Sequence, residues 1–370
     1  MSDTDHLAQI SPREVPAAVT ETLRGYFAGR RGESENIDAV FGDIVDSLES
    51  FVLNGGKRVR PAFAWQGWLG AGGAEATSSD REDPAAVLTA VSSLELIQAC
   101  ALIHDDIIDD ADTRRGFPTI HKVYEAKHRE NGWRGSAPRY GVSTAILAGD
   151  VALAWADDML HSSGLSRDAI ARALVPWRAM RTEVLGGQLL DITAEASSDG
   201  RVETAQKVNL YKTAAYTIER PLHIGAAIAG APDKLIAAYR SFGRDIGVAF
   251  QLRDDQLGVF GDPAVTGKPA GDDLREGKRT VLVGTALQIF NGSDPKKAQI
   301  IDENLGNVSS PEDIDRLREL IAESGAADEV EREIDRLTER AFKSLEKADL
   351  PEANRENLIA MGIRATTRQS

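Results

Sequence analysis

Apolar residues recur at intervals of three and four positions along most of the chain, which is the spacing of one face of an α-helix. Alanine, leucine, glutamate and arginine, which favour helices, are abundant in the same stretches, and strand-like alternation is scarce. The pattern predicts helices over 17–30, 36–53, 58–70, 84–110, 142–163, 167–194, 201–229, 232–260, 279–291, 311–323, 325–347 and 352–365. We therefore expect an all-α protein.

The breaks between these helices set the predicted organisation. The stretches 70–84 and 126–141 are polar and contain glycines, so we expect a surface loop and a loop or lid there. Residues 261–277 hold four glycines and two prolines, which argues against a regular helix. No internal repeat or low-complexity linker is evident. The sequence thus predicts a polar tail over 1–16 and a single helical domain over 17–370 with peripheral C-terminal helices.

Composition narrows the classes of function. Of the 370 residues, 42% are hydrophobic, which is enough for a large core. The formal net charge of −15 disfavours binding to nucleic acid or anionic lipid, because both need a basic surface. The single cysteine, Cys100, cannot form an intrachain disulfide, which fits a cytoplasmic protein. The N-terminus lacks a secretory signal, and charge or glycine interrupts the long apolar stretches, so we expect no transmembrane segment.

A long apolar helix ends in a cluster of aspartates. Asp105 and Asp109 lie four positions apart and share a helical face, and Asp106 lies ~100° around from Asp105. Carboxylates at a helix C-terminus repel one another and the negative end of the helix dipole, so we expect cations to hold them. Oxygen ligands without His or Cys suit Mg²⁺, and the following Arg114 and Arg115 suit phosphate. The alternative is a solvated acidic helix end followed by a basic turn.

A second apolar helix ends in Asp254 and Asp255, with Gln251 one turn earlier. The glycine-rich segment that follows and the residue after it carry, among other charges, Lys268, Asp272, Asp273 and Lys278. Two acidic clusters about 150 residues apart can flank one site if their helices pack side by side. Roughly three Mg²⁺ ions between them could neutralise a diphosphate leaving group. Paired aspartates alone are a weak signal, but their duplication with flanking lysines is a strong one.

Positive charges gather at two other helical segments. Lys57 and Arg60 lie three apart where a helix begins after a glycine turn, and the free N–H groups of a helix N-terminus would add to an anion site. A capped helix with exposed cations is the alternative. Lys212 and Thr213 lie mid-helix, where the lysine either binds phosphate or is simply exposed.

Four further polar residues allow two interpretations. Gln188 and Asp191 lie three apart on one helix and could hydrogen-bond toward a pocket or toward neighbouring helices. His104 and His121 lack metal-ligand partners at usable spacing. We expect His104 behind the acidic cluster, and His121 either as a phosphate donor or as a plain loop histidine.

With these motifs, the chain resembles the trans-isoprenyl diphosphate synthases, also called polyprenyl synthetases, and especially bacterial geranylgeranyl diphosphate synthases. The resemblance runs from about residue 20 to the end. Its seven motifs, in chain order, are Gly55 to Pro61, His104 to Gly116, Gly149-Asp150, Gly187 to Asp191, Lys212-Thr213, Phe250 to Asp255 and Gly267 to Lys278. It implies an isoprenoid synthase-type orthogonal helical bundle around a central cavity, forming a homodimer. The implied activity is the Mg²⁺-dependent condensation of isopentenyl diphosphate with allylic diphosphates.

The resemblance also implies roles for particular residues. The Mg²⁺ ligands would be Asp105, Asp106, Asp109, Asp254 and Asp255. The allylic diphosphate would be held by Arg114, Lys212, Lys268 and Lys278, with Thr213 and Gln251 also on the substrate side. Isopentenyl diphosphate would be held by Gly56, Lys57, Arg60, Gln98 and Arg115, where Gln98 replaces a histidine common in the family. The groups expected to drive catalysis are Asp105, Asp106, Asp109, Arg114, Lys212, Asp254 and Lys268.

One position departs from the family pattern. Gly258 stands where the second cluster usually has its third aspartate, which weakens the case for three carboxylates there. Asp262 lies too far along the chain, past a glycine, to replace the missing group by helix geometry. We nevertheless expect activity, because Asp254 keeps the family spacing.

Product length should depend on the helix that ends at Asp105. Loss of diphosphate from the allylic substrate leaves a cation, which the isopentenyl double bond attacks, so no side chain needs to act as a nucleophile. The product would grow past Cys100 and Ala101, ~6–7.5 Å below Asp105 by helical rise. Both are small, whereas short-chain members have an aromatic residue there. Ile97 would form part of the floor, and Trp155 would lie near the opposing wall, so we expect geranylgeranyl diphosphate.

Three alternatives stay open at this point. The product could be farnesyl diphosphate or a longer polyprenyl diphosphate. A class I terpene cyclase would share the first acidic cluster and the helical fold, but it needs no isopentenyl diphosphate site. A non-catalytic regulatory subunit typically loses an aspartate cluster, whereas this chain lacks only one carboxylate, at Gly258.

Overall fold

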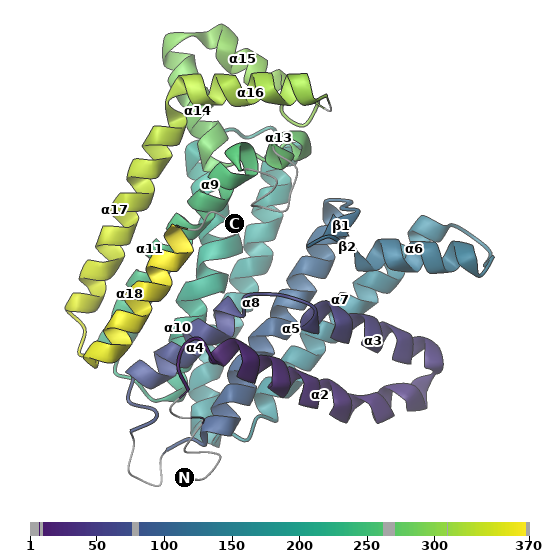
Figure 1. Cartoon of the computed structure of the whole chain (residues 1–370), viewed down its shortest axis with the longest axis vertical. Helices are drawn as coiled ribbons and strands as arrows, with labels where there is room; N and C mark the ends of the chain where they lie inside the picture. The colour runs from purple at the N-terminus through teal and green to yellow at the C-terminus, as the bar shows by residue number, and fades with distance from the viewer. Residues whose placement is uncertain (1–6, 8–9, 76–80, 262–270, 309, 368–370) are drawn as a thin grey trace. The chain divides into compact units, whose positions relative to one another are not determined.

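The computed structural model describes residue 7 and residues 10–75, 81–261, 271–308 and 310–367. These residues are helical almost throughout, with one two-stranded hairpin, so the predicted all-α class is confirmed (Figure 1). The chain divides into two compact units. Unit 1 comprises Met1–Ala173 with Ala227–Gly230, and unit 2 comprises Leu174–Ala226 with Ala231–Ser370. The single domain predicted over 17–370 stays a prediction.

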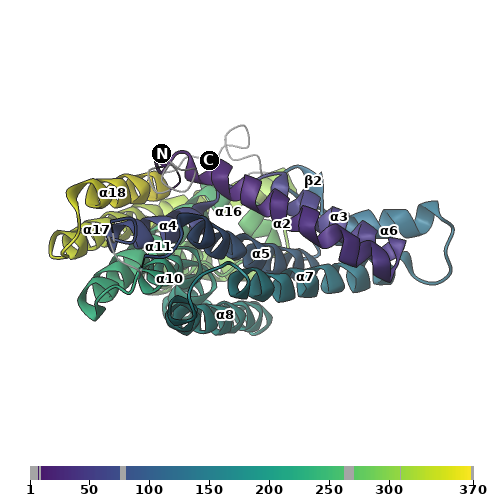
Figure 2. The ribbon, with the colours of Figure 1, turned by 90° about the horizontal axis from the view of Figure 1, so that it is seen from below.

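Unit 1 is built around one central helix. Its elements are α2 (Val15–Ile37), α3 (Ala39–Leu53), α4 (Val59–Gly70), α5 (Pro84–Ile108), β1 (Thr113–Arg114), β2 (Phe117–Pro118), α6 (Ile120–Glu130) and α7 (Ala137–His161). Helix α5 packs against α2, α3, α4 and α7, and α5 and α7 run side by side in both views (Figures 1 and 2). Trp65, Trp68 and Leu94 are fully buried in this core. The aspartates at the end of α5 are therefore carried by the best-supported helix of the unit.

Helix α5 is apolar on nearly all sides. By length and composition alone it could cross a membrane, which makes it the one weak exception, among the described residues, to the expectation of no transmembrane segment. Its most apolar stretch is, however, 78% buried within the protein, and the core helix of a soluble protein passes the same test. Glu95, a charged residue within this stretch, is itself buried against Arg58.

Unit 2 contains the remaining helices. They are most of α8 (Arg167–Ala196), α9 (Val202–Val208), η1 (Asn209–Glu219), most of α10 (Arg220–Ile228), α11 (Asp233–Phe260), α13 (Asp272–Glu276), α14 (Val281–Ser293), α15 (Pro295–Asn304), α16 (Pro311–Ser324), α17 (Ala326–Glu346) and α18 (Glu352–Thr366). Helix α11 packs against η1, α17 and α18. Leu252, Leu282 and Ile301 belong to the buried core of unit 2. The second acidic cluster thus also ends a well-packed helix.

Several elements differ from the sequence prediction. Helix α6 and the start of α7 occupy much of the stretch 126–141 that was expected to be a loop, and α15 was not expected. Helices α6 and α15 are short and hold few apolar residues, so neither shows the long apolar stretch that marks the other helices. The five-residue helix α13 lies inside 261–277. The helix predicted over 201–229 has a π-helical middle, η1, between two α-helical parts.

Candidate active site

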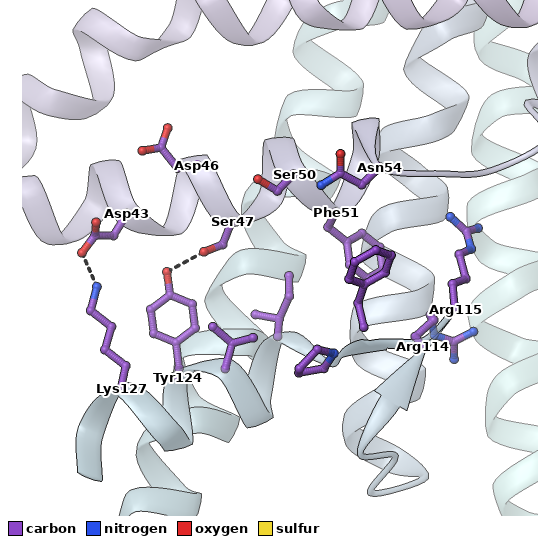
Figure 3. A pocket seen from close by; sticks show the side chains of 14 residues that line it. Asp43, Asp46, Ser47, Ser50, Phe51, Asn54, Arg114, Arg115, Tyr124 and Lys127 are labelled. Atoms are coloured by element: carbon purple, nitrogen blue, oxygen red, sulfur yellow. Dashed lines mark hydrogen bonds and ion pairs between the residues drawn. The ribbon is translucent and has the colours of Figure 1, made fainter. Parts of the chain in front are cut away.

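A tight hairpin in unit 1 carries Arg114 and Arg115 (Figure 3). Arg114 on β1 pairs with Phe117 on β2, and the two residues between them, Arg115 and Gly116, have φ of +56° and +79°. Positive φ at both central residues is the signature of a turn that matches the twist of a hairpin. The turn therefore fixes two neighbouring guanidinium groups on a short, constrained arm.

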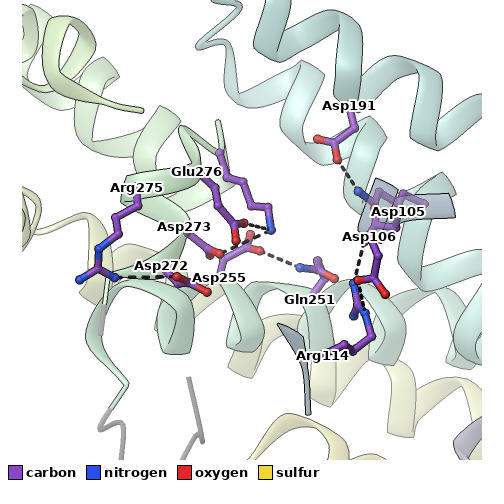
Figure 4. Close-up of polar contacts among 12 residues, drawn as sticks. Asp105, Asp106, Arg114, Asp191, Gln251, Asp255, Asp272, Asp273, Arg275 and Glu276 are labelled. Atoms are coloured by element: carbon purple, nitrogen blue, oxygen red, sulfur yellow. Dashed lines mark hydrogen bonds and ion pairs between the residues drawn. The ribbon is translucent and has the colours of Figure 1, made fainter. Parts of the chain in front are cut away.

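The hairpin brings Arg114 to the first acidic cluster. Asp105 and Asp106 lie in the last turn of α5, and Asp109 is its C-cap. Arg114 Nε donates to Asp106 Oδ1 at 2.5 Å, and Arg114 Nη2 lies 3.3 Å from Asp105 Oδ2 (Figure 4). One guanidinium thus bridges two carboxylates, as charge-assisted hydrogen bonds favour.

Asp106 is the most buried member of the cluster. Burial raises the pKa of Asp106 to about 6, against the opposing effect of Arg114, and the neighbouring carboxylates Asp105 and Asp109 raise it further. Its Oδ2 is buried without a hydrogen-bond partner among the described residues. An additional cation at this cluster would relieve both costs, and an all-oxygen donor set suits Mg²⁺.

The Gly55–Arg60 segment forms a second basic site in unit 1. Gly55 and Gly56 have φ of +146° and +101°, so the loop depends on glycine. A Cβ at Gly55 would lie 3.2 Å from Arg115 Nη1, which shows that Arg115 rests against this loop. Lys57 is exposed and Arg60 is half-buried. The structure therefore brings Arg115 to the loop that was predicted to bind isopentenyl diphosphate.

Arg58 and Glu95 form a buried ion pair beneath this loop, which sequence reasoning missed. Arg58 Nη1 donates to Glu95 Oε2 at 2.6 Å and Nη2 donates to the Val52 carbonyl at 2.7 Å. Arg58 has the left-handed φ of +51° as the residue that caps α4. Arg58 is buried and its guanidinium is engaged inside the protein, so we infer that it supports the glycine loop and does not bind substrate. The available signal was one glutamate, Glu95, in an otherwise apolar helix.

The two histidines have different surroundings. His104 Nε2 lies 3.2 Å from the Ile146 carbonyl oxygen. A Cβ at Gly149 would lie only 2.2 Å from the same His104 Nε2. This close approach explains the glycine of the Gly149-Asp150 motif. His121 is buried in α6, and burial lowers its pKa, so the interpretation as a plain loop histidine is wrong.

The second acidic cluster lies at the end of α11 in unit 2. Asp254 is half-buried, whereas Asp255 is buried and accepts from Gln251 Nε2 at 2.8 Å and from Asn209 Nδ2 at 3.3 Å (Figure 4). Burial raises the pKa of Asp255 to about 7, and the nearby Asp273 carboxylate raises it as well. Gln251 thus supports Asp255, one turn on, and the cluster again holds negative charge that a cation would stabilise.

A carboxylate from outside α11 fills the space beside Gly258. A Cβ built at Gly258 would lie 1.9 Å from Asp273 Oδ2 and 2.4 Å from its Cγ. Asp273 comes from α13, fifteen residues further along the chain. The position that lacks its family aspartate is therefore occupied by another aspartate. No role was predicted for Asp273, and the glycine at position 258 was the only hint of one.

Replacing Gly258 with aspartate should lower the free energy of unfolding by about 1–3 kcal/mol, because the new Cβ and the Asp273 carboxylate cannot share the same space. The measurement is urea-induced loss of helical circular dichroism. Gly292→Asp is the matched control, since a Cβ at Gly292 meets nothing within 4 Å. The double variant Gly258→Asp/Asp273→Gly should recover the loss. Equal effects at positions 258 and 292 would contradict the steric explanation.

Lys212 lies on the π-helix η1 and reaches α8. Its Nζ donates to Asp191 Oδ2 at 2.5 Å, so the interpretation of Lys212 as a merely exposed lysine is wrong. A Cβ at Gly187 would lie 2.3 Å from the Lys212 backbone nitrogen, so this glycine permits the contact between the helices. Asp191 therefore hydrogen-bonds to a neighbouring helix. π-helical turns occur frequently at functional sites.

Other predicted residues have simpler outcomes. Lys278 Nζ lies 2.5 Å from Glu276 Oε2 and 3.9 Å from Asp273 Oδ1, which places it at the second cluster. Lys268 and Asp262 lie outside the described residues. Thr213 follows Lys212 on η1, and Gln98 is half-buried on α5.

The residues predicted to set product length lie along α5. Ile97 and Cys100 are buried, and Ala101 is half-buried. Burial raises the pKa of the Cys100 thiol to about 12, so it stays neutral. The Trp155 ring packs edge-on against Tyr26 and Phe27 of α2.

Neither cluster forms a metal cage from protein alone. Within the described part of the chain, no group of three or more His, Cys, Asp or Glu side chains is arranged to hold a metal ion by itself. Mg²⁺ usually binds through one or two carboxylates, water and substrate phosphates, so this arrangement suits Mg²⁺ that arrives with a diphosphate.

The comparisons with known proteins agree with this geometry. The sequence profile described as polyprenyl synthetase matches residues 43–323. Geranylfarnesyl diphosphate synthase of Aeropyrum pernix is 35% identical over 310 residues, covering 82% of this chain and 87% of that protein. Geranylgeranyl diphosphate synthase of Mycobacterium tuberculosis (strain ATCC 25618 / H37Rv) is 32% identical over 308 residues, covering 83% and 78%.

A solved structure is more similar still. The crystal structure of geranylgeranyl pyrophosphate synthase from Corynebacterium glutamicum, complexed with isoprenyl diphosphate and magnesium, is 53% identical, with a TM-score of 0.93. The match covers 97% of this chain and 100% of that one. The chain therefore belongs to the polyprenyl synthetase family, a family of trans-prenyltransferases. Within it, its similarity includes the geranylgeranyl diphosphate synthases.

Proposed function

We propose that this chain condenses isopentenyl diphosphate with an allylic diphosphate, releases diphosphate, and makes geranylgeranyl diphosphate as its main product. The observation that carries the proposal is the cluster of Asp105, Asp106 and Arg114, where carboxylates and a guanidinium converge on the end of a buried helix. The similarity to a synthase crystallised with isoprenyl diphosphate and magnesium supports it.

We propose Mg²⁺ as the cofactor, roughly three ions per site, held by diphosphate oxygens together with Asp105, Asp106, Asp109, Asp254 and Asp255. When bound, the ions would supply positive charge that offsets the charge of the leaving diphosphate. Asp106 would also hold Arg114 through its Oδ1, which leaves its buried Oδ2 for the ion. Asp273 would provide the carboxylate that position 258 lacks.

The protein's own cations would bind the two substrates. Arg114, Lys212 and Lys278 would hold the allylic diphosphate and stabilise its negative charge as the carbon–oxygen bond breaks. Gly56, Lys57, Arg60 and Arg115 would hold isopentenyl diphosphate on the glycine loop, which α4 follows with its free N–H groups. Buried walls around the reacting carbon would exclude water from the cation.

One assay tests this function against its two rivals. The purified chain is incubated with isopentenyl diphosphate, each allylic primer and Mg²⁺, and the product length is determined. We expect elongated prenyl diphosphate, and no turnover after chelation of the metal. A terpene cyclase would release hydrocarbon without elongation, and a non-catalytic regulatory subunit would give no product. Either result would overturn the proposal.

Replacing Ala101 with phenylalanine should shift the main product from geranylgeranyl to farnesyl diphosphate, because the ring would block growth along α5 below Asp105. Cys100→Phe should act in the same direction, although that site is more buried. Product chromatography is the measurement. Leu102→Phe, ~100° around the helix from Ala101, is the control and should leave the product unchanged. An unaltered product from both Ala101→Phe and Cys100→Phe would show that the chain grows elsewhere.

We also propose a cytoplasmic homodimer. Each unit leaves large apolar side chains exposed on one helix: unit 1 exposes Ile146 and Leu147 on α7, and unit 2 exposes Leu185 and Leu189 on α8. Monomeric soluble proteins rarely expose contiguous apolar patches, and most soluble oligomers are symmetric dimers. Sedimentation of the purified protein tests the assembly state.

A further inference from the structure

Unit 1 has a pocket whose lining residues, apart from Arg114 and Arg115, have no role in the function proposed above. It measures about 440 Å³ and lies between α3, the β1–β2 hairpin and α6 (Figure 3). Pockets that bind small molecules typically measure ~300–1,000 Å³. The pocket is therefore large enough for a ligand of substantial size.

The middle of the pocket is apolar and aromatic. Phe51 comes from α3, Phe117 from the hairpin, and Val123 and Tyr124 from α6. Phe117 is 62% exposed and Val123 is 41% exposed. Apolar side chains exposed in a concave surface mark a binding site more often than scattered ones do. The pocket therefore favours a ligand with an apolar body.

The two ends of the pocket differ in charge. Arg114 and Arg115 line one end, whereas Asp43 and Asp46 line the other (Figure 3). At that other end Asp43 is paired with Lys127, and Asp46 lies 3.5 Å from Arg31, so both carboxylates are offset by cations. An amphiphile with one anionic head would therefore place its head toward the arginines and its chain along the aromatic floor.

Polar contacts already join α3 and α6, the two helices that form walls of the pocket. The hydroxyls of Ser47 on α3 and Tyr124 on α6 lie 3.1 Å apart, and Lys127 on α6 donates to Asp43 on α3. A pocket that is formed in advance loses little entropy when a ligand binds.

The pocket shares its basic end with the two diphosphate-binding segments of unit 1. Arg114 lines the pocket and donates to Asp105 and Asp106. Arg115 lines it and rests against Gly55. A ligand whose anionic head attracts these two guanidinium groups would change the position of the hairpin relative to the acidic cluster.

We propose that this pocket is a second, regulatory site for a prenyl diphosphate, and that its occupation lowers turnover through the Arg114–Arg115 hairpin. This inference rests on the proposed function for the identity of the ligand, because a prenyl diphosphate has one anionic head, one apolar chain, and is the compound the chain would make. Product that accumulates would then inhibit its own synthesis.

Calorimetric titration with geranylgeranyl diphosphate in the presence of Mg²⁺ tests the second site. We expect two molecules per chain for the unmodified protein, one for Val123→Asp, and two for the matched control Val40→Asp, whose side chain is exposed on α3 outside the pocket. Ser50→Trp, which fills the pocket from α3, should also bind one molecule and serves if Val123→Asp does not fold. One molecule per chain in the unmodified protein would overturn the proposal, as would two in both pocket variants.

Kinetics test the regulatory effect. In Val123→Asp we expect unchanged initial turnover without added product, and at least a tenfold weaker inhibition by geranylgeranyl diphosphate than in Val40→Asp. Equal inhibition of the two variants would overturn the regulatory role. If palmitate binds the same pocket as tightly as the prenyl diphosphate does, the assignment to prenyl diphosphates fails.

Failure of the proposed function would look different. Asp105→Asn should lose binding at the acidic cluster and keep one molecule in the pocket. An unmodified protein that binds two molecules but never elongates a primer would reject the proposed activity and leave the pocket in place. Normal elongation with one molecule bound would reject the pocket alone.

Discussion

Replacing Asp105 with asparagine should lower kcat by about 10²–10³-fold, the loss typical of removing one preorganised group that stabilises transition-state charge. Asp105 lies in the last turn of α5 beside Arg114, and it is proposed to hold Mg²⁺ with the allylic diphosphate. Asparagine keeps the shape and removes the charge. The measurement is steady-state incorporation of labelled isopentenyl diphosphate at saturating Mg²⁺.

The control for this prediction lies a few residues away. Asp110 is 85% exposed at its side chain and pairs with Lys122. Asp110→Asn should therefore change kcat by less than about twofold, since exposed ion pairs contribute little. Circular dichroism should show both variants folded. A folded Asp105→Asn protein with normal kcat would remove the first acidic cluster from the mechanism.

Replacing Glu95 with alanine should lower the free energy of unfolding of unit 1 by about 3–5 kcal/mol, because it leaves the Arg58 guanidinium buried without its counter-ion. Arg58 would keep its bond to the Val52 carbonyl, which cannot neutralise the charge. Denaturant titration followed by tryptophan fluorescence suits this measurement. Four of the five tryptophans, Trp65, Trp68, Trp133 and Trp155, belong to unit 1.

Two further variants separate charge burial from general disturbance. Glu21→Ala breaks an exposed ion pair with Arg24 in the same unit and should cost less than about 1 kcal/mol. Arg58→Met/Glu95→Leu replaces the buried pair with apolar side chains and should recover much of the loss. If Glu95→Ala and Glu21→Ala were equally mild, the ion pair would not support the glycine loop in the way described.

The fold could be predicted from sequence where apolar residues continue over a long stretch. The helices that end at the two acidic clusters were predicted because their apolar residues extend over more than twenty positions. Helices α6 and α15 were missed because they are short and hold few apolar residues. The π-helical form of η1, which packs against α11 and α9, was not predicted.

The site could be predicted where it consists of residues close together in sequence. The aspartates, Arg114 and the glycine loop were all identified from short motifs. The roles of Asp273 and Glu95 were not predicted, because their partners, Gly258 and Arg58, lie fifteen and thirty-seven positions away in the sequence. Only folding brings each pair together. That the two acidic clusters share one set of Mg²⁺ ions stays a prediction.

The π-helix η1 makes the number of residues before Lys212 as important as their identity. A π-helical turn accommodates one more residue than an α-helical turn, so deleting a single residue between Asn209 and Lys212 would let the segment relax into an α-helix. Side chains on either side of the deletion would then be turned by ~100° relative to one another. Asn209, which donates to Asp255, and Lys212, which donates to Asp191, could not both keep their partners. The length of this segment is therefore constrained as well as its composition.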